Sequence, residues 1–452
     1  MSGICGVVAL DGAPVDRAGL EQWSDFLRFR APDGVHMQVR GGFGFTHASM
    51  RTLDTPQPPQ PLSLDGATWI TCDARIDAQS ELKAKLLALG RDASRASDAQ
   101  LILHAYHAWG EDCLGHLLGD FTFAIWDAPR RRLLCARDHF GVKPFFYAHA
   151  DRRVVFSNTL NCVLAHPAVP RALDELAIAD FLVHEANLDT GGTAFKAVRR
   201  LPPAHCLVAT AAGITVKRYW SLPDREVIYR DDGEYVQRFK DLLDMAVADR
   251  VRSDRVGILM SGGLDSCAVA AGAAVVERGA GRSSGLKAFT VVYDRLIPDD
   301  ERRHVTAAAS ALGIPLSLRC ADDSALFERH EELGTFFPEP ANKPFAAIEV
   351  STAREAARHG RVILTGWDGD ALMTESPRPY FRSLLRQRRL GRLLSNAMGY
   401  ALAEKKLLPA GALARLNPWR SPVPPAPLRL PPWLSGEFER RLGLRERAAE
   451  FA

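Results

Sequence analysis

The chain has 452 residues, of which 47% are hydrophobic and 25% charged, a composition typical of a globular protein with two or three domains. No apolar run approaches the roughly 20 residues that cross a bilayer, and the chain does not begin with a basic segment followed by an apolar one. The eight cysteines show neither CxxC nor Cys/His ligand spacing, which argues against a zinc site or a disulfide scaffold. We therefore expect a cytoplasmic protein with reduced thiols and no membrane partner.

The net charge of +3 is unevenly distributed along the chain. Residues 376–452 carry 15 Lys and Arg against 5 Glu, a charge of +10, so residues 1–375 carry −7. A basic segment can bind nucleic acid or an acidic peptide. A solvated helical face, or a surface whose covering segment is missing, explains the charge as well. We favour one of these two structural explanations over nucleic-acid binding, so a nucleic-acid partner is not expected.

The first half of the chain shows short apolar runs separated by turns, which is typical of antiparallel strands. Strands are predicted at 3–10, 66–76, 119–127, 131–138 and 154–158. The segment 99–109 has helical periodicity instead. We predict an α+β domain at 1–205, followed by a linker at 206–231 that the neighbouring prolines of "RRLPPAH" and "YWSLPDRE" mark.

Strands alternate with helices in the second half of the chain. The predicted elements are helix 234–250, strand 255–260, helix 266–278, strand 286–293, helix 301–312 and strand 361–367. Such alternation is typical of a parallel, doubly wound sheet. We therefore predict an α/β domain at 232–452.

The string "SGGLDS", which begins at Ser261, follows a predicted strand and opens a predicted helix. Such a turn presents free backbone N–H groups, which together with the helix dipole form a phosphate cradle. Gly262 and Gly263 allow close approach of the backbone, and Ser261 and Ser266 supply hydroxyls. Asp265 would repel a phosphate unless a cation lay between them, which predicts a magnesium ion.

A second glycine-rich strand end is "LTGWDGDALM", which begins at Leu364. Ligands of a doubly wound sheet bind at the carboxyl ends of its strands. Asp265 and Asp370 could then hold one metal ion between two strand ends, with Thr365 and Gly366 beside the nucleotide. A surface Asp-Gly turn is the alternative.

Together these strings resemble the asparagine synthetase family, which joins a glutaminase-type domain of the N-terminal-nucleophile class to a synthetase domain of the ATP-pyrophosphatase type. The strings in family order are "GICGVV", "APDG", "SDAQLIL", "GDFTFAIWD", "LLCARDHFGVKPFFY", "VVFSN", "RRLPPAH" and "SGGLDS". The last is similar to the pyrophosphate loop of enzymes that cleave ATP between the α- and β-phosphates and transfer AMP to an acyl oxygen. The resemblance implies an N-terminal-nucleophile-type sandwich followed by a doubly wound domain, with ATP and Mg²⁺ as cofactors.

The resemblance also implies roles for individual residues. Asp265 and Asp370 become the candidate catalytic and metal-binding residues. The implied contacts are Leu259 and Val291 with adenine, Thr365 and Gly366 with AMP, and Asp265 and Asp370 with magnesium–pyrophosphate.

The glutaminase pocket departs from the family pattern. The glutaminases begin Met-Cys-Gly-Ile, and removal of Met exposes a Cys whose own α-amine acts as base. This chain has Ser2 at that position, and an alcohol is far less ionised than a thiol. The family's Asn-Gly-Glu string reads Asp73-Ala74-Arg75, and only Asp98 matches the carboxylate that holds the substrate amine. We expect Ser2, Asp73, Arg75 and Asp98 to be the remnant of a glutamine site in an inactive domain.

The synthetase pocket departs from the family pattern too. Trp367 stands where asparagine synthetases usually carry an acidic residue, and Asp370-Ala371 replaces an Asp-Glu pair. An aromatic side chain there suits a bulkier or less polar acyl substrate than aspartate, which assigns Trp367 and Asp368 to the substrate pocket. Together with the missing Cys, this pattern looks most like the lasso-peptide macrolactam synthetases and the β-lactam synthetases.

Three functions remain open. The first is an AMP-forming amide ligase that adenylates a side-chain carboxylate of a precursor peptide, whose own N-terminal amine then closes a ring; the peptide's processing protease would be a further partner. The second is an asparagine synthetase that uses ammonia or glutamine. The third is a truncated, non-catalytic nucleotide-binding protein, because family members continue further and carry a Lys that Lys405 and Lys406 do not clearly match. A homodimer is also open.

Overall fold

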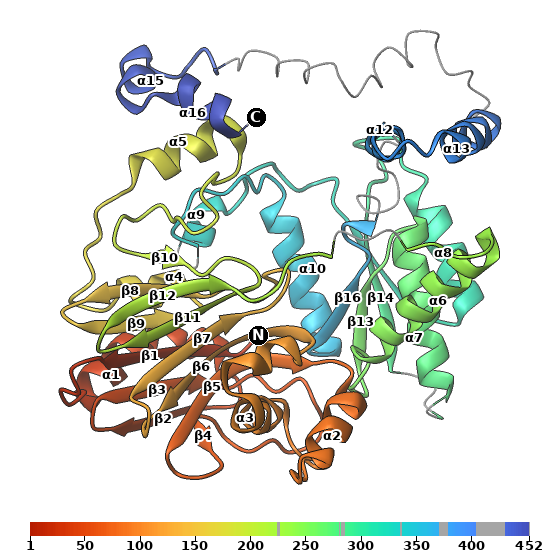
Figure 1. Ribbon diagram of the computed structural model, residues 1–452. Helices are drawn as coiled ribbons and strands as arrows, with labels where there is room; N and C mark the ends of the chain where they lie inside the picture. The colour runs from red at the N-terminus through yellow and green to blue at the C-terminus, as the bar shows by residue number, and fades with distance from the viewer. Residues whose placement is uncertain are drawn as a thin grey trace. The chain divides into compact units, whose positions relative to one another are not determined.

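The computed structural model describes residues 1–223, 227–279, 281, 285–334, 337–369, 378–403 and 430–451 (Figure 1). The chain divides into two compact units, Met1–Thr365 and Gly366–Ala452. Within the described residues, no helix has both the length and the apolar character needed to cross a membrane.

Two six-stranded antiparallel sheets form the N-terminal part of the first unit. Sheet A has the order β10-β8-β9-β1-β3-β2, and sheet B the order β12-β11-β7-β6-β5-β4. The strands of sheet A are β1 (Gly3–Ala9), β2 (Val35–Arg40), β3 (Phe43–Ala48), β8 (Phe146–Ala150), β9 (Arg153–Ser157) and β10 (Arg199–Arg200). The strands of sheet B are β4 (Leu62–Ser63), β5 (Thr68–Ile76), β6 (Gly119–Asp127), β7 (Arg132–Arg137), β11 (His205–Thr210) and β12 (Gly213–Arg218).

The two sheets pack face to face, and helices cover both outer faces (Figure 1). Every residue of β1 is buried, because Ile4 and Val8 point into the core between the sheets while Cys5 and Val7 point toward the outer helices. Sheet A is covered by α1 (Arg17–Ser24), η1 (Asp25–Arg30) and α4 (Leu160–Leu164), and sheet B by α2 (Gln79–Ala88), α3 (Asp98–Trp109) and η2 (Gly110–Gly115). Helix α5 (Glu175–His184) precedes β10. The predicted α+β sandwich is thus confirmed.

The third sheet of the first unit is parallel, with the order β15-β14-β13-β16. Its strands are β13 (Val256–Leu259), β14 (Leu286–Val292), β15 (Leu316–Cys320) and β16 (Val362–Thr365). The helices around it are α6 (Asp232–Ala248), α7 (Leu264–Gly279), α8 (Glu301–Leu312), α9 (His330–Gly334) and α10 (Ala346–His359). Helices α6, α7 and α8 lie on one face and α10 on the other (Figure 1), which confirms the doubly wound α/β fold.

The strand order of this sheet reverses between β13 and β16. The chain moves outward from β13 to β14 and β15, then returns through α10 to place β16 on the other side of β13. In doubly wound sheets, the loops that follow two such strands diverge to opposite faces and leave a crevice between them. The crevice at the carboxyl ends of β13 and β16 is therefore where a ligand is expected.

The second unit contains α12 (Arg378–Arg386), α13 (Leu390–Ala403), α15 (Gly436–Leu442) and α16 (Leu444–Phe451). Helices α12 and α13 pack through Phe381, Leu384 and Leu393. Lys405 and Lys406 lie outside the described residues.

The predicted linker at 206–231 is wrong in its first part, because residues 206–218 contain most of β11 and all of β12. Cys206 and Leu207 alternate between the two faces of sheet B and are fully buried. Moreover, the contact-defined boundary lies at Thr365, not near residue 231, because the parallel sheet packs closely with the sandwich.

Asn158 fixes the start of β1 and hence the position of Ser2. Its buried Oδ1 accepts the N–H of Ile4 at 3.0 Å, and its Nδ2 donates to the carbonyl of Ser2 at 2.8 Å. Ser157 Oγ donates to the carbonyl of Ile4 at 2.7 Å. The segment that follows β9 thus satisfies backbone groups of β1 that its neighbouring strands do not reach.

We predict that Asn158→Ala lowers the free energy of unfolding by about 2–4 kcal/mol, because it leaves a buried donor and a buried acceptor unpaired. Chemical denaturation followed by circular dichroism measures the loss. Gln22→Ala, which removes an exposed amide of α1, serves as the control. Equal stability of the two variants would show that Asn158 does not hold β1.

Asp33 connects the sandwich to the parallel sheet. Its carboxylate accepts the backbone N–H of Arg51 at 2.7 Å and pairs with the guanidinium groups of Arg51 and Arg361, the latter adjoining β16. The side chain of Asp33 is only 6% exposed. Burial raises the pKa of this carboxyl, but hydrogen bonds from Arg361 and Arg51 outweigh burial and lower the pKa to about 2.

Because the folded-state pKa of Asp33 lies below its ordinary value of 3.8, its ionised form stabilises the fold above about pH 4. This stabilisation is lost as the pH falls through the folded-state pKa. We predict that Asp33→Asn lowers the melting temperature at pH 7, and that the gap to the wild type narrows as the pH falls from about 4 toward 2. Thermal melts between pH 7 and pH 3 test this, with exposed Glu21→Gln as the control. A gap independent of pH would contradict the assignment.

Candidate functional site

Strands β13 and β16 run side by side, with Leu259 opposite Thr365 in the last pair of the ladder. On the other side of β13, Leu259 pairs with Phe289 of β14, so Val291 lies two residues further toward the same edge. The structure thus brings Leu259, Val291 and Thr365 to one edge of the sheet. Gly366 follows Thr365 directly in the chain.

The "SGGLDS" string forms a tight turn between β13 and α7. Ser266 Oγ accepts the N–H of Ser261 at 2.9 Å and lies 2.9 Å from Ser261 Oγ. Ser261 Oγ in turn accepts the N–H of Gly263 at 3.2 Å. These contacts hold the turn in one conformation at the N-terminus of α7, where backbone N–H groups and the helix dipole attract anions.

The first turn of α8 covers this loop. Glu301 Oε1 accepts the N–H of Gly262 at 2.5 Å, and a Cβ built on Gly262 would overlap the Cβ of His304. Only glycine fits at residue 262 without moving the backbone. Sequence reasoning missed Glu301 and His304, since no motif around them indicates that α8 would reach the loop.

Asp265 lies half-buried in the first turn of α7, directly after the loop. Magnesium in nucleotide sites is held by one or two carboxylates together with phosphate oxygens, so a carboxylate at this position fits the ion. Asp370, the predicted second ligand, lies outside the described residues.

The two residues predicted to line a substrate pocket, Trp367 and Asp368, belong to the turn that follows Gly366. The Trp367 side chain is 70% exposed, and Asp368 has a left-handed backbone with φ of 65°. Gly369 donates its N–H to the carbonyl of Gly366 at 3.4 Å.

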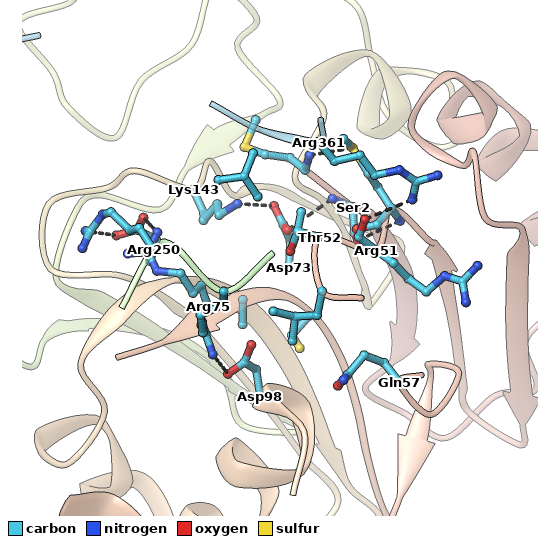
Figure 2. A pocket seen from close by; sticks show the side chains of 18 of the residues that line it. Ser2, Arg51, Thr52, Gln57, Asp73, Arg75, Asp98, Lys143, Arg250 and Arg361 are labelled. Carbon is cyan, nitrogen blue, oxygen red and sulfur yellow. Dashed lines mark hydrogen bonds and ion pairs between the residues drawn. The ribbon is translucent and has the colours of Figure 1, made fainter. Parts of the chain in front are cut away.

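A cavity of about 900 Å³ lies between the sandwich and the parallel sheet. Ser2, Asp73 and Asp98 line it on the sandwich side, and Ile363 and Thr365 line it on the side of β16. All four predicted residues of the glutamine-site remnant line it, and Figure 2 shows Asp73 between Ser2 and Lys143.

Ser2 has backbone partners but no base in contact with its hydroxyl among the described side chains. Its N–H donates to Asp73 Oδ1 at 3.2 Å, and its Oγ accepts the N–H of Met50 at 3.1 Å. Lys143 Nζ lies 3.1 Å from Asp73 Oδ2. An aspartate paired with a lysine thus stands where the family has the Asn of its Asn-Gly-Glu string.

Arg75 is engaged in ion pairs within the sandwich. Its guanidinium contacts Asp77 Oδ1 at 2.8 Å and Asp120 Oδ2 at 2.8 Å. Arg250, which follows α6, lies 3.7 Å from the Asp77 carboxylate and 3.9 Å from that of Asp120. A charge that would repel a substrate amine therefore occupies this side of the cavity.

Asp98 is engaged as well. Its Oδ1 accepts the side-chain amide of Gln79 at 2.7 Å and the N–H of Ile76 at 3.2 Å. Arg252, from the segment that leads into β13, lies 3.6 Å from the same oxygen. Burial raises the pKa of the Asp98 carboxyl, although Arg252 and these hydrogen bonds oppose the effect. The carboxylate that matches the family's amine-binding residue is thus contacted by groups of this chain.

His47 of β3 also lines the cavity and is only 5% exposed. Burial lowers its pKa to about 4, against the opposing charge of Asp73. The imidazole is therefore neutral near pH 7 and adds no positive charge to the cavity. Sequence reasoning missed His47, Lys143 and Arg252 as parts of this site, and only Lys143 lies in a string that carries the resemblance.

Comparison with known proteins finds two matching family models. A glutamine amidotransferase domain matches residues 1–220, and an asparagine synthase model matches residues 238–433. Asparagine synthetase (glutamine-hydrolyzing) 3 of Bacillus subtilis is 32% identical over 279 residues, which cover 61% of this chain and 45% of that protein. The amidase chyE of Penicillium rubens is 30% identical over 249 residues, which cover 52% of this chain and 36% of that protein.

The match thus spans less than half the length of each of these two relatives. Among solved structures, the glutamine phosphoribosylpyrophosphate amidotransferase of Bacillus subtilis, complexed with ADP and GMP, is 13% identical. The alignment covers 80% of this chain and 90% of the amidotransferase chain, with a TM-score of 0.37. The chain is thus similar to the asparagine synthetase family over two successive parts, a glutamine amidotransferase domain followed by an asparagine synthase domain.

Proposed function

We propose that the chain is an ATP-dependent, AMP-forming amide ligase whose amine does not come from glutamine. The observation that carries this proposal is the position of the "SGGLDS" loop at the strand-order reversal, beside the carboxyl end of β16. The asparagine synthase match covers this loop and both strands.

In the proposed reaction, a substrate carboxylate oxygen attacks the α-phosphorus of ATP, and pyrophosphate leaves. The backbone N–H groups of the loop would hold the departing pyrophosphate. An amine then attacks the acyl carbon, the amide forms, and AMP leaves with the acyl oxygen. Magnesium, held by Asp265 and by Asp370 as we predict, would neutralise phosphate charge.

The remnant pocket supports an amine source other than glutamine. Residue 2 is a serine and not a cysteine, Asp73 pairs with Lys143, and Asp98 contacts Arg252 instead of a free amine. An intramolecular amine would remove the need for a glutaminase, because it converts a bimolecular attack into a unimolecular one.

We further propose that the acyl substrate is a side-chain carboxylate of a precursor peptide, which its own N-terminal amine closes into a macrolactam. The exposed Trp367 offers an apolar contact suited to a peptide and unsuited to aspartate.

Ammonia-dependent asparagine synthesis is a second candidate. The cavity favours it, because both Ser2 of the sandwich and Thr365 of β16 line the same cavity. Free ammonia could use such a space without any glutaminase chemistry.

We predict that the purified chain exchanges pyrophosphate into ATP in the presence of magnesium and its acyl substrate, and that Gly262→Ala lowers its affinity for ATP about tenfold or more. The added Cβ would overlap His304 and force the loop backbone to shift. Gly279→Ala, at the other end of α7 where the added Cβ meets no atom, is the matched control. Titration calorimetry measures binding.

Exchange that requires aspartate would establish the second candidate and contradict peptide cyclisation. ATP binding without exchange on any carboxylate would favour a non-catalytic nucleotide-binding protein. Unchanged ATP affinity in Gly262→Ala would place the nucleotide elsewhere.

We also predict that the chain releases no glutamate from glutamine above the buffer background, and that Ser2→Ala leaves this result unchanged. An alcohol is far less ionised than a thiol at neutral pH, so Ser2 is a poor nucleophile even with its own α-amine as the base. A coupled glutamate dehydrogenase assay tests this. Glutamate release by the wild type that Ser2→Ala abolishes would show a working serine glutaminase.

A further inference from the structure

Glu301 places a carboxylate on the loop that is proposed to receive pyrophosphate. Its Oε1 accepts the N–H of Gly262 at 2.5 Å. A hydrogen bond from a backbone N–H to an ionised carboxylate is charge-assisted and stronger than one between neutral groups. Phosphate oxygens bind loops of this kind through the same backbone N–H groups. A side chain of the protein itself, Glu301, thus supplies the acceptor for one of the loop's N–H groups.

No other ionic role accounts for this carboxylate. Glu301 is half-buried and forms no ion pair with any described residue. The first turn of α8 is held by a different group, since Asp299 Oδ1 accepts the N–H of Glu301 at 2.8 Å and Asp299 Oδ2 accepts the N–H of Tyr293 at 3.1 Å. The helix start therefore does not need the Glu301 side chain.

The surrounding backbone keeps Glu301 beside the loop. His304, one turn further along α8, packs against Gly262 so closely that a Cβ on Gly262 would overlap it. The loop is held in turn by the Ser261–Ser266 contact. The Glu301 carboxylate is thus tethered at the loop at a high effective concentration.

We propose that Glu301 is a tethered anion that occupies the Gly262 amide and competes with pyrophosphate for it. This inference rests on the proposed nucleotide site and adds how that site is regulated. A phosphate group must displace Glu301 or accept repulsion from it, so the carboxylate weakens binding of free pyrophosphate and eases its release after adenylation. Glu301 is a positioning residue, which acts on the substrate through the loop.

Glu301→Gln tests the competition, because the amide keeps the size and an acceptor oxygen but removes the charge. We expect the variant to bind metal-free pyrophosphate about fivefold to tenfold more tightly than the wild type, the factor by which a hydrogen bond to a charged acceptor exceeds one to a neutral acceptor. Asp300→Asn removes the same charge from the neighbouring exposed residue, which has no contact with the loop, and is expected to stay within about twofold of the wild type.

Titration calorimetry with pyrophosphate in EDTA, and with ATP and magnesium, provides the measurement. Glu301→Ala is the second variant and is expected to tighten metal-free pyrophosphate binding as well. Equal or weaker binding of metal-free pyrophosphate by Glu301→Gln would overturn the competition. Weaker binding of only the magnesium complex would likewise overturn it, by making Glu301 a metal ligand.

The failure of the proposed function gives a different result. If neither the wild type nor Glu301→Gln binds ATP or pyrophosphate under any condition, the nucleotide site itself is wrong. If the wild type binds ATP or pyrophosphate, the nucleotide site stands. The ratio of the affinities of variant and wild type for pyrophosphate then tests only the role of Glu301.

Discussion

The pairing of β13 with β16 is the constraint on which the candidate site depends. Four parallel pairs, from Val256 opposite Val362 to Leu259 opposite Thr365, hold the two strands in register. Both strands therefore end at the same level, and the loops that follow them open at one edge of the sheet. Helices α7 and α10 lie on opposite faces of this sheet (Figure 1). A shift of β16 to the other edge of the sheet would leave the glycine loop without its second wall.

Charged groups connect the sandwich to the segments around the parallel sheet. Acidic side chains of the sandwich are paired with groups from the segments around the parallel sheet: Asp98 with Arg252, Asp33 with Arg361, and Asp54 with the N–H of Asp254 at 2.7 Å. Buried ion pairs add little net stability but fix geometry, because either partner alone would be an unpaired charge. The remnant pocket has thus become a joint between the sandwich and the parallel sheet.

Much of the fold could be predicted from the sequence because its signals are local. The strands at 119–127 and 154–158 and the helix at 301–312 follow from alternation or helical spacing, and the structure has β6, β9 and α8 there. Strands β2 and β15 are among those that were missed, since most of their side chains are only partly buried and give no clear apolar alternation. The linker was misplaced because prolines mark turns inside a domain as readily as boundaries between domains.

The candidate site was predictable to the extent that single strings encode it. The loop residues from Ser261 to Ser266 stand together in the chain, so their spacing reveals them. Glu301 and Arg252 reach their partners from other elements, and only the crossover connection and the packing of the parallel sheet on the sandwich bring them close. The spacing of residues along the chain cannot predict contacts between elements that are far apart in the sequence.

The pairing of Asp98 with Arg252 bears on what a glutamine pocket of the family's kind would need in this chain. A thiol at residue 2 would still face the negative charge of Asp73. A glutamate at residue 75 would stand among Asp77 and Asp120, whose present partner is Arg75. Release of Asp98 for a substrate would leave Arg252 without this partner. A change of Arg75 or of Arg252 alone would therefore leave carboxylates without their present partners and lower the stability of the fold.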